Sequence, residues 1–268
     1  MKKIKISKIV DFLKCEFIGD LGGEIKGFSS CDSLKLGCLT FLINDYNLNP
    51  GFGAVLLDEA GYCKRPRDFG NYLIVDNPKL CFARVLREFY ESSHKPEIIF
   101  SGPKDNTLEG KVHRTVEIEG NVYLDFTVKI QPFVSIGTEG FGHVKNEKGE
   151  WEEFPQIGGV RIGENVEIAA GCNIHRGTLD DTTIGEGTKI STHCNIGHNC
   201  QIGKHVFIGG NTNLGGGTKI GDYSFIGMRV VTGPQTKIGK HVAVGMGSVV
   251  TKDLPDNALA YGNPAKLY

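Results

Sequence analysis

The sequence predicts a mainly β protein: a left-handed parallel β-helix of hexapeptide repeats, preceded by a small N-terminal α/β domain. Between Ile184 and Val250 an aliphatic residue returns at every sixth position, with Thr232 as the single exception. A period of six fits neither an α-helix, which repeats every 3.6 residues, nor an amphipathic strand, which repeats every two. It fits a solenoid in which three six-residue sides form one triangular coil and each aliphatic side chain covers the one below.

A second observation is that the residues two positions before the aliphatic ones are small. They are Thr182, Thr188, Cys194, Cys200, Val206, Thr212, Thr218, Ser224, Val230, Thr236, Val242 and Ser248. Small side chains suit a tight corner that packs against the aliphatic position. Glycine follows most of the aliphatic residues, as in IGEG, IGHN and IGKH, where we expect the chain to turn.

The same register extends upstream, over 112–136 and 162–174, with two interruptions. One is a long loop at 137–156, and the other is a surplus of four residues within 175–181. Extra residues leave a solenoid only as outside loops, and such loops often carry binding sites. The long loop holds the only tryptophan, Trp151, together with Phe141 and Phe154, so we interpret it as functional.

The N-terminal segment has a different sequence pattern, with predicted helices as well as strands. SKIVDFLK predicts a short helix, and GEIKGFSS, CLTFLI, GAVLLD and YLIVDN predict strands. The stretch NPKLCFARVLREFYESS predicts an amphipathic helix, with Asn77 as N-cap and Pro78 at its first position. We therefore divide the chain into an α/β domain (1–103), a β-helix (104–250) and a C-terminal tail (251–268). A role for the first domain as a folding cap of the solenoid remains open.

Composition limits the functional classes. The 268 residues carry a formal net charge of −1, which gives no electrostatic footprint for nucleic acid. The basic start MKKIKISKIVDFLK lacks a long apolar run, so we expect neither a signal peptide nor a membrane span. None of the eight cysteines forms a CxxC pair, and three of them occupy the small inward positions. We expect a cytoplasmic protein.

His198 is the strongest candidate for chemistry. It follows the turn glycine in NIGHNC, and since one coil is about eighteen residues, it should stack near Gly216 and then Pro234. The LGGG run leaves that surface bare and exposes backbone N–H groups. A histidine base beside an exposed N–H suits acyl transfer to an amine. Asp180, eighteen residues earlier, is a candidate partner of the imidazole, and a bystander histidine is the alternative.

Over nearly the whole chain, the sequence resembles the UDP-3-O-acylglucosamine N-acyltransferases of lipid A synthesis. The markers are GFG…W…PQIG, RGTLDDT and the histidine of IGHN, in this order. The resemblance implies a homotrimer with active sites between subunits, a nucleotide-activated amino sugar as substrate, His198 as general base and Gly216 as backbone oxyanion donor. LKLGCLTFLIND resembles the uridine-binding domain of that family. The substrate-binding candidates that we take from it are Phe41, Asn44, Tyr46, Phe141, Trp151 and His175, the last at a position where the family usually has Asp.

The C-terminus departs from that family. A second family histidine aligns with Gln235, and we expect no counterpart of the family's helical extension that engages acyl carrier protein. The ending VVTKDLPDNALAYGNPAKLY instead resembles the closing segment of hexapeptide acetyltransferases that use acetyl-CoA. This second resemblance implies CoA contacts by Lys252, Asn263, Pro264 and Lys266. We therefore predict an acetyl-CoA-dependent N-acyltransferase acting on a nucleotide-linked amino sugar, with a hydroxyacyl chain from acyl carrier protein as the alternative donor.

Two further classes stay open. His175, His193 and His198 could surround a zinc ion at a subunit interface, as in hexapeptide-type carbonic anhydrases. A non-catalytic scaffold is the other. We expect neither, and we expect no metal.

Overall fold

The computed structural model describes residues 3–42, 53–63, 70–90, 98–101 and 111–268. The chain forms two compact units, one of Met1–Ser93 with Gly142–Pro155 and one of His94–Phe141 with Gln156–Tyr268. The predicted loop at 137–156 is therefore shared, because its ends belong to the second unit and its middle to the first. Each unit is described by itself below.

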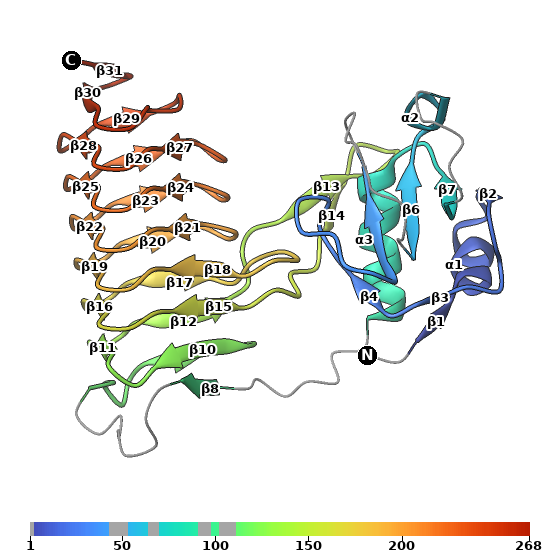
Figure 1. The fold of residues 1–268 in the computed structure, drawn as a ribbon, viewed down its shortest axis with the longest axis horizontal. Coiled ribbons are helices and arrows are strands. Elements are labelled where there is room, and N and C mark those ends of the chain that lie inside the picture. Colours follow the sequence, from blue (N-terminus) through green and yellow to red (C-terminus); the bar gives the residue numbers. More distant parts are fainter. Residues whose placement is uncertain (1–2, 43–52, 64–69, 91–97, 102–110) are drawn as a thin grey trace. The chain divides into compact units, whose positions relative to one another are not determined.

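The N-terminal unit is an α/β domain, as predicted (Figure 1). Its five-stranded sheet has the order β2-β7-β6-β5-β4, in which only the β2–β7 pair is antiparallel. The strands are β2 (Glu16–Ile18), β4 (Gly27–Phe28), β5 (Cys38–Phe41), β6 (Ala54–Leu57) and β7 (Tyr72–Ile74). The other elements are α1 (Ile6–Leu13), α2 (Glu59–Cys63), α3 (Pro78–Phe89) and the antiparallel pair β1 (Ile4–Lys5) with β3 (Glu24–Ile25).

Helix α3 confirms the start signal read from the sequence. Pro78 is its first residue, and the Asn77 side chain accepts a hydrogen bond from the Leu80 N–H at 3.1 Å. This cap satisfies one of the N–H groups that have no partner within the helix. The buried face of α3 carries Leu80, Phe82 and Leu86.

The hairpin β13 (His143–Lys145) and β14 (Trp151–Glu153) is part of this unit. The guanidinium of Arg84 on α3 pairs with Glu147 at 2.9 Å and with Glu152 at 2.8 Å. Phe154, 4% exposed, stacks on Phe82 with ring centroids 6.1 Å apart. The middle of the long insertion is thus anchored to the N-terminal unit by an aromatic contact and by ion pairs.

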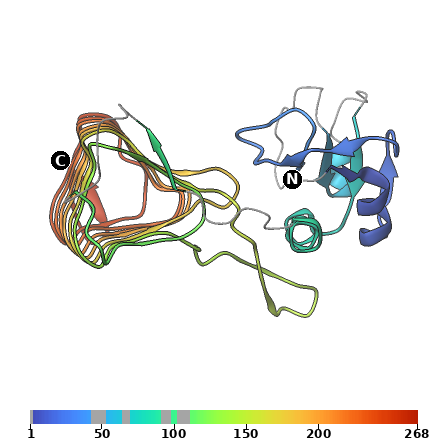
Figure 2. The same ribbon diagram turned by 90° about the horizontal axis from the view of Figure 1, so that it is seen from below.

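The second unit is the predicted parallel β-helix, whose coils superimpose as a triangle in Figure 2. Its first sheet contains β8 (Ile98–Ser101), β10 (Val122–Asp125), β15 (Val160–Ile162), β18 (Thr182–Ile184), β21 (Gln201–Ile202), β24 (Lys219–Ile220) and β27 (Lys237–Ile238). The second contains β11 (Lys129–Ile130), β16 (Glu167–Ile168), β19 (Lys189–Ile190), β22 (Phe207–Ile208), β25 (Phe225–Ile226), β28 (Ala243–Val244), β30 (Leu259–Gly262) and β31 (Ala265–Leu267). The third contains β9 (Glu117–Ile118), β12 (Ser135–Thr138), β17 (Asn173–His175), β20 (Asn195–Ile196), β23 (Asn213–Leu214), β26 (Val231–Thr232) and β29 (Val249–Val250).

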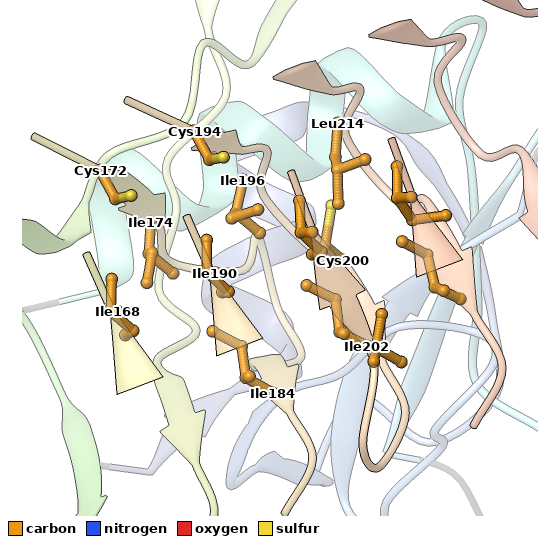
Figure 3. Close-up of a cluster of buried hydrophobic side chains, with 14 of the residues drawn as sticks. Ile168, Cys172, Ile174, Ile184, Ile190, Cys194, Ile196, Cys200, Ile202 and Leu214 are labelled. Atoms are coloured by element: carbon orange, nitrogen blue, oxygen red, sulfur yellow. The ribbon is translucent and has the colours of Figure 1, made fainter. Parts of the chain in front are cut away.

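The inward rows explain the repeat. Aliphatic residues stack on their equivalents in the neighbouring coils, as in the pairs Ile184↔Ile202 and Ile190↔Ile208, and Figure 3 shows them lining the core. They are at most 4% exposed between Ile184 and Val250, and Thr232 is buried like the rest. The small residues two positions earlier are also buried. Since full burial of one such aliphatic side chain is worth about 1.5–3 kcal/mol, the repeat itself supplies the core.

The glycines after the aliphatic positions have a different role from the one predicted. Gly197, Gly203 and Gly221 do not have positive φ. A Cβ at each of them would lie within 2.8 Å of an atom in the next coil. Glycine is needed there because neighbouring coils approach closely, and the left-handed turn residue comes two positions later, as at Asn199.

The tail continues the helix. Leu254 forms a parallel bridge with Ile238 of β27, and β30 pairs with β28 before β31 folds back on β30. All eight cysteines are free. In the described parts of the chain, no helix has the length and apolar run that spanning a membrane requires.

Candidate active site

Both insertions leave the β-helix at one corner, where the third sheet passes into the first (Figure 2). The long one lies between β12 and β15, and the short one between β17 and β18. His198 lies in the next turn at this corner, between β20 and β21. We call this corner the His198 edge; in the following coils it carries Gly216, Pro234 and Lys252.

His198 is half-buried between two glycines. An added Cβ on Gly216, one coil further on, would lie 2.5 Å from His198 Nε2. An added Cβ on Gly140, at the start of the long insertion, would lie 2.7 Å from His198 Cβ. Any side chain at these two positions would displace the imidazole. The predicted proximity of His198 and Gly216 is therefore present within a single chain.

The backbone N–H of Gly216 makes no hydrogen bond among the described residues. Gly215 N–H donates to Thr232 Oγ1 and Gly217 N–H donates to the His198 carbonyl. Among the described residues, no acceptor lies within hydrogen-bond distance of the Gly216 N–H. This N–H is therefore available to a ligand.

The opposite ring nitrogen of His198 is held by neutral groups. His198 Nδ1 lies 2.9 Å from Asn199 Oδ1 and 3.4 Å from Thr178 Oγ1. Asn199 Oδ1 also accepts the Thr178 N–H at 3.0 Å. Because a backbone N–H can only donate, it identifies this amide atom as the oxygen. An oxygen acceptor requires a proton on His198 Nδ1, which leaves Nε2 with the free lone pair.

Thr178 connects the short insertion to the long one. Its carbonyl accepts the Ile157 N–H at 2.8 Å, and its hydroxyl donates to Asn199 Oδ1 at 2.7 Å. The Gly140 N–H donates to Gln156 Oε1 at 3.2 Å, which joins the two ends of the long insertion. Together with Gly216, the residues around the imidazole therefore come from four consecutive coils.

Asp180 was predicted as a partner of the imidazole because it lies eighteen residues before His198. The coil there is longer than the eighteen residues assumed in that count, since Ile174 pairs with Ile196. Asp180 contributes its backbone carbonyl to the Asn199 amide at 3.4 Å. The sequence reasoning missed Asn199 and Thr178, although the IGHN and RGT segments contain them.

His175 is engaged within its own chain. Its Nδ1 lies 2.9 Å from the Glu139 carbonyl, and its Nε2 lies 3.2 Å from Asn195 Oδ1 and 3.0 Å from Asn173 Nδ2. It belongs to a polar network on the third sheet next to the His198 edge.

The other predicted substrate residues are dispersed. Phe41 is half-buried, with its ring centroid 4.8 Å from Phe82 in the N-terminal unit. Trp151 is 65% exposed on the hairpin, with the Lys145 ammonium 5.0 Å from its ring centroid. Phe141 is 92% exposed. Asn44 and Tyr46 lie outside the described residues.

The predicted CoA residues separate into two groups. Lys252 is exposed on the His198 edge, two coils beyond Gly216. Asn263, Pro264 and Lys266 are exposed in the β30–β31 hairpin, which extends the second sheet rather than this edge. The structure therefore does not bring these four residues together.

The histidines of the zinc hypothesis occupy different places. His193 precedes β20, at the corner between the second and third sheets, and His198 follows β20. Within the described ranges, no group of three or more His, Cys, Asp or Glu side chains could hold a metal ion.

A triangular β-helix with a histidine and an available backbone N–H on one edge is the arrangement expected of a hexapeptide-repeat acyltransferase. The family model for bacterial transferase hexapeptide repeats matches residues 181–216 and 217–252. UDP-3-O-acylglucosamine N-acyltransferase of Pseudomonas syringae pv. tomato is 30% identical over 251 residues, covering 75% of this chain and 69% of that protein. The chain belongs to the family of these hexapeptide-repeat N-acyltransferases.

Two further comparisons concern parts of the chain. The enzyme of the same name from Coxiella burnetii (strain Dugway 5J108-111) is 53% identical over 75 residues, which are 28% of this chain and 22% of that protein. Among solved structures, the UDP-N-acetylglucosamine acyltransferase of Francisella novicida has a TM-score of 0.50 at 20% identity. It covers 59% of this chain and 67% of that one, and this likeness concerns the fold alone.

Proposed function

We propose that the protein transfers an acetyl group from acetyl-CoA to the amine of a nucleotide-linked amino sugar, in a pathway of cell-surface polysaccharide or lipopolysaccharide synthesis. The observation that carries this proposal is the packing of Gly216 against His198 Nε2, with the Gly216 N–H uncommitted. A proton acceptor and an oxyanion donor on opposite sides of a reacting carbonyl are what aminolysis of a thioester requires.

The reaction follows from these two groups. His198 Nε2 removes a proton from the amine as its nitrogen attacks the thioester carbonyl, forming the C–N bond. The Gly216 N–H donates to the resulting oxyanion. When the C–S bond breaks, the imidazolium returns the proton to the departing thiolate, and the imidazole is neutral again.

Acetyl is proposed as the acyl group because the side chains beside His198 and Gly216 are polar. Asn195 and Asn213 face outward on the third sheet, and Gln201 and Lys219 face outward on the first. A long acyl chain needs an apolar channel, because each buried CH₂ contributes about 0.8 kcal/mol. The closing segment that resembles acetyl-CoA-dependent enzymes also favours this donor.

The second candidate function is transfer of a hydroxyacyl chain from acyl carrier protein to UDP-3-O-acylglucosamine. It is favoured by the names of the relatives, which are UDP-3-O-acylglucosamine N-acyltransferases. The discriminating experiment is a matrix of donors and acceptors. Acetyl-CoA and hydroxyacyl-carrier thioesters are each combined with UDP- and dTDP-amino sugars, and amide formation is followed by mass spectrometry. Product only from the hydroxyacyl donor would replace the first proposal by the second.

We further propose that the active protein is a homotrimer. The His198 edge is an outward corner of the solenoid, so a neighbouring copy is needed to close the substrate groove. Light scattering that gives a monomer at micromolar concentration would contradict this assembly. The free cysteines support action in a reducing compartment, which we take to be the cytoplasm.

A further inference from the structure

Several outward lysines of the β-helix pair with a carboxylate in a neighbouring coil. On the second sheet, Lys129 and Lys189 both pair with Glu167, at 3.1 and 2.9 Å. At the corner between the first and second sheets, Lys204 pairs with Glu186 and Lys240 with Asp222, both at 3.1 Å. In these places, ion pairs between neighbouring coils compensate the charge of the lysines.

Lys219 and Lys237 on the first sheet break this pattern. They are directly opposite each other in the parallel register of β24 and β27, and both are exposed. No carboxylate among the described residues lies within salt-bridge distance of either ammonium group. Like charges directly opposite each other on one sheet are destabilising, so this pair of cations has no stabilising role in the chain alone.

The two lysines line a groove of about 400 Å³ on the outer face of the first sheet. Its other polar lining residues are Thr183, Gln201, Lys240 and Asp256. The Asp256 carboxylate accepts the Lys240 N–H at 2.8 Å, and the Lys240 ammonium is paired with Asp222. The groove therefore contains two lysines without a salt-bridge partner in the described part of the chain, Lys219 and Lys237, together with one carboxylate, Asp256, and neutral hydrogen-bonding groups from Gln201 and Thr183. A second carboxylate, Asp253, accepts the backbone N–H of Lys237 at 2.7 Å.

The groove covers the outer face of the first sheet and reaches its far corner with the second sheet, where it is lined by Gly203, Gly221 and Gly239. The side of the groove nearer to the His198 edge is the row of Thr183, Gln201, Lys219 and Lys237. Lys219 and Lys237 follow Gly216 and Pro234, the edge residues of the next two coils, by three positions each. Because strands are about 4.8 Å apart, the lysines lie roughly 5 and 10 Å further along the solenoid axis than the coil of His198. Both insertions lie in coils before His198, so the side towards the lysines is the unobstructed one.

We propose that Lys219 and Lys237 bind the phosphate at the end of the pantetheine arm of the acyl donor. The inference rests on the proposed acyl transfer, and it names the donor's anionic end as the ligand of the groove. A pantetheine arm is comparable to four or five extended residues, roughly 15 Å, which spans the distance from the His198 edge to this pair. The phosphate is common to CoA, where it is part of a diphosphate, and to the prosthetic group of an acyl carrier protein.

The variant that tests the inference is the double substitution Lys219→Gln with Lys237→Gln. It keeps the outward position and removes both charges. The matched control is Lys189→Gln, which removes an outward lysine of the second sheet away from the groove. Binding of CoA and of 4′-phosphopantetheine is measured by calorimetry at low salt, which needs no turnover. We expect the double variant to raise both dissociation constants at least tenfold, and the control to leave them unchanged.

Steady-state kinetics give the second readout. The double variant should raise the KM for acetyl-CoA at least tenfold with little change in kcat, and it should use acetyl-pantetheine, which lacks the phosphate, as well as the wild type does. If binding of holo-acyl carrier protein is weakened instead of CoA binding, the inference holds and the donor is the carrier.

Unchanged dissociation constants for CoA, phosphopantetheine and carrier protein would overturn the inference. An equal rise of the KM for acetyl-pantetheine would also overturn it, because acetyl-pantetheine lacks the phosphate and the substitutions would then affect another part of the donor. Failure of the proposed function appears differently, as a wild-type protein that binds these ligands but transfers no acyl group from them.

Discussion

Asn199 Oδ1 lies 2.9 Å from His198 Nδ1 and, through its bond with the Thr178 N–H, fixes which nitrogen of the imidazole is free. Asn199 has φ = 60°, a left-handed conformation that asparagine tolerates better than most residues. The turn that ends the coil thus also orients the proposed base.

The first prediction concerns Asn199 as a positioning residue. Glycine accepts its left-handed conformation without strain, so Asn199→Gly removes the amide and keeps the turn. We expect kcat to fall roughly tenfold, one hydrogen bond to a charged group being worth about 1.5–3 kcal/mol. The acidic limb of the kcat–pH profile should move to lower pH, because the imidazolium loses an acceptor.

The conservative variant Asn199→Asp separates this role from a structural one. A carboxylate beside Nδ1 favours the imidazolium, so the acidic limb should move to higher pH while turnover is largely kept at alkaline pH. Two variants with equal kcat losses and unshifted profiles would show that Asn199 only supports the loop.

The second prediction concerns His198 as general base, which is typically worth about 10²–10⁴ in rate. His198→Ala should lower kcat by that factor with little change in substrate KM. The controls His193→Ala and His205→Ala lie in the turns before the third and second sheets, and they should change kcat far less. Near-normal turnover by His198→Ala would remove the mechanism and favour a scaffold role.

The third prediction concerns Gly216. Alanine there would bring a methyl group to within 2.5 Å of His198 Nε2, so the imidazole must move. A misplacement of about 1 Å can cost 10²-fold, and we expect kcat to fall by about that factor with a small change in melting temperature. At Gly233, one coil further on and next to the edge, the nearest atom to an added Cβ is 3.4 Å away. Gly233→Ala should therefore leave kcat nearly unchanged.

The repeat was predictable because it is set by neighbours in the coil stack. One six-residue rule located both inward rows, from Thr182 to Val250, and marked the two insertions as outside loops. The stacking of His198 on Gly216 followed from the same rule, since no insertion interrupts that coil.

The rule did not locate the residues that meet His198 Nδ1 where the coil length changes. Ile174 pairs with Ile196, and counting eighteen residues back from His198 does not lead to Asn199 or Thr178, which lie next to Nδ1. The attachment of the hairpin to α3 could not be predicted either. It depends on Arg84 meeting Glu147 and Glu152, and no periodicity relates these distant segments.

The fourth prediction concerns that attachment. Hydrogen bonds from Arg84 and Arg87 lower the pKa of Glu152 to about 2. A carboxylate whose pKa is lower in the folded state stabilises the fold above its unfolded pKa of about 4.3, and this contribution is lost as the pH falls towards the folded value. The hairpin should therefore loosen progressively between about pH 5 and pH 2.

Trp151, the only tryptophan, reports on the hairpin directly. The denaturant midpoint, followed by Trp151 fluorescence, should fall between pH 5 and pH 3 in the wild type. Arg84→Ala with Arg87→Ala should lower the midpoint at pH 7 and flatten its pH dependence. Lys204→Ala, which removes an ion pair of the β-helix, should keep the wild-type slope. Equal slopes in all three proteins would assign the acid transition to other carboxylates.

The last prediction concerns the acyl donor. The side chains beside His198 and Gly216, namely Asn195, Asn213 and Gln201, offer hydrogen bonds rather than apolar surface. A hydroxyacyl chain placed along them would keep its methylene groups in water and forfeit about 0.8 kcal/mol for each. We expect kcat/KM for acetyl-CoA to exceed that for any C12–C14 hydroxyacyl-carrier thioester at least ~100-fold, about 2.7 kcal/mol. Competition between the two donors for one amino-sugar acceptor measures the ratio in a single tube. A ratio below one would contradict acetyl-CoA as the donor, and it would assign the protein to lipid A-type N-acylation.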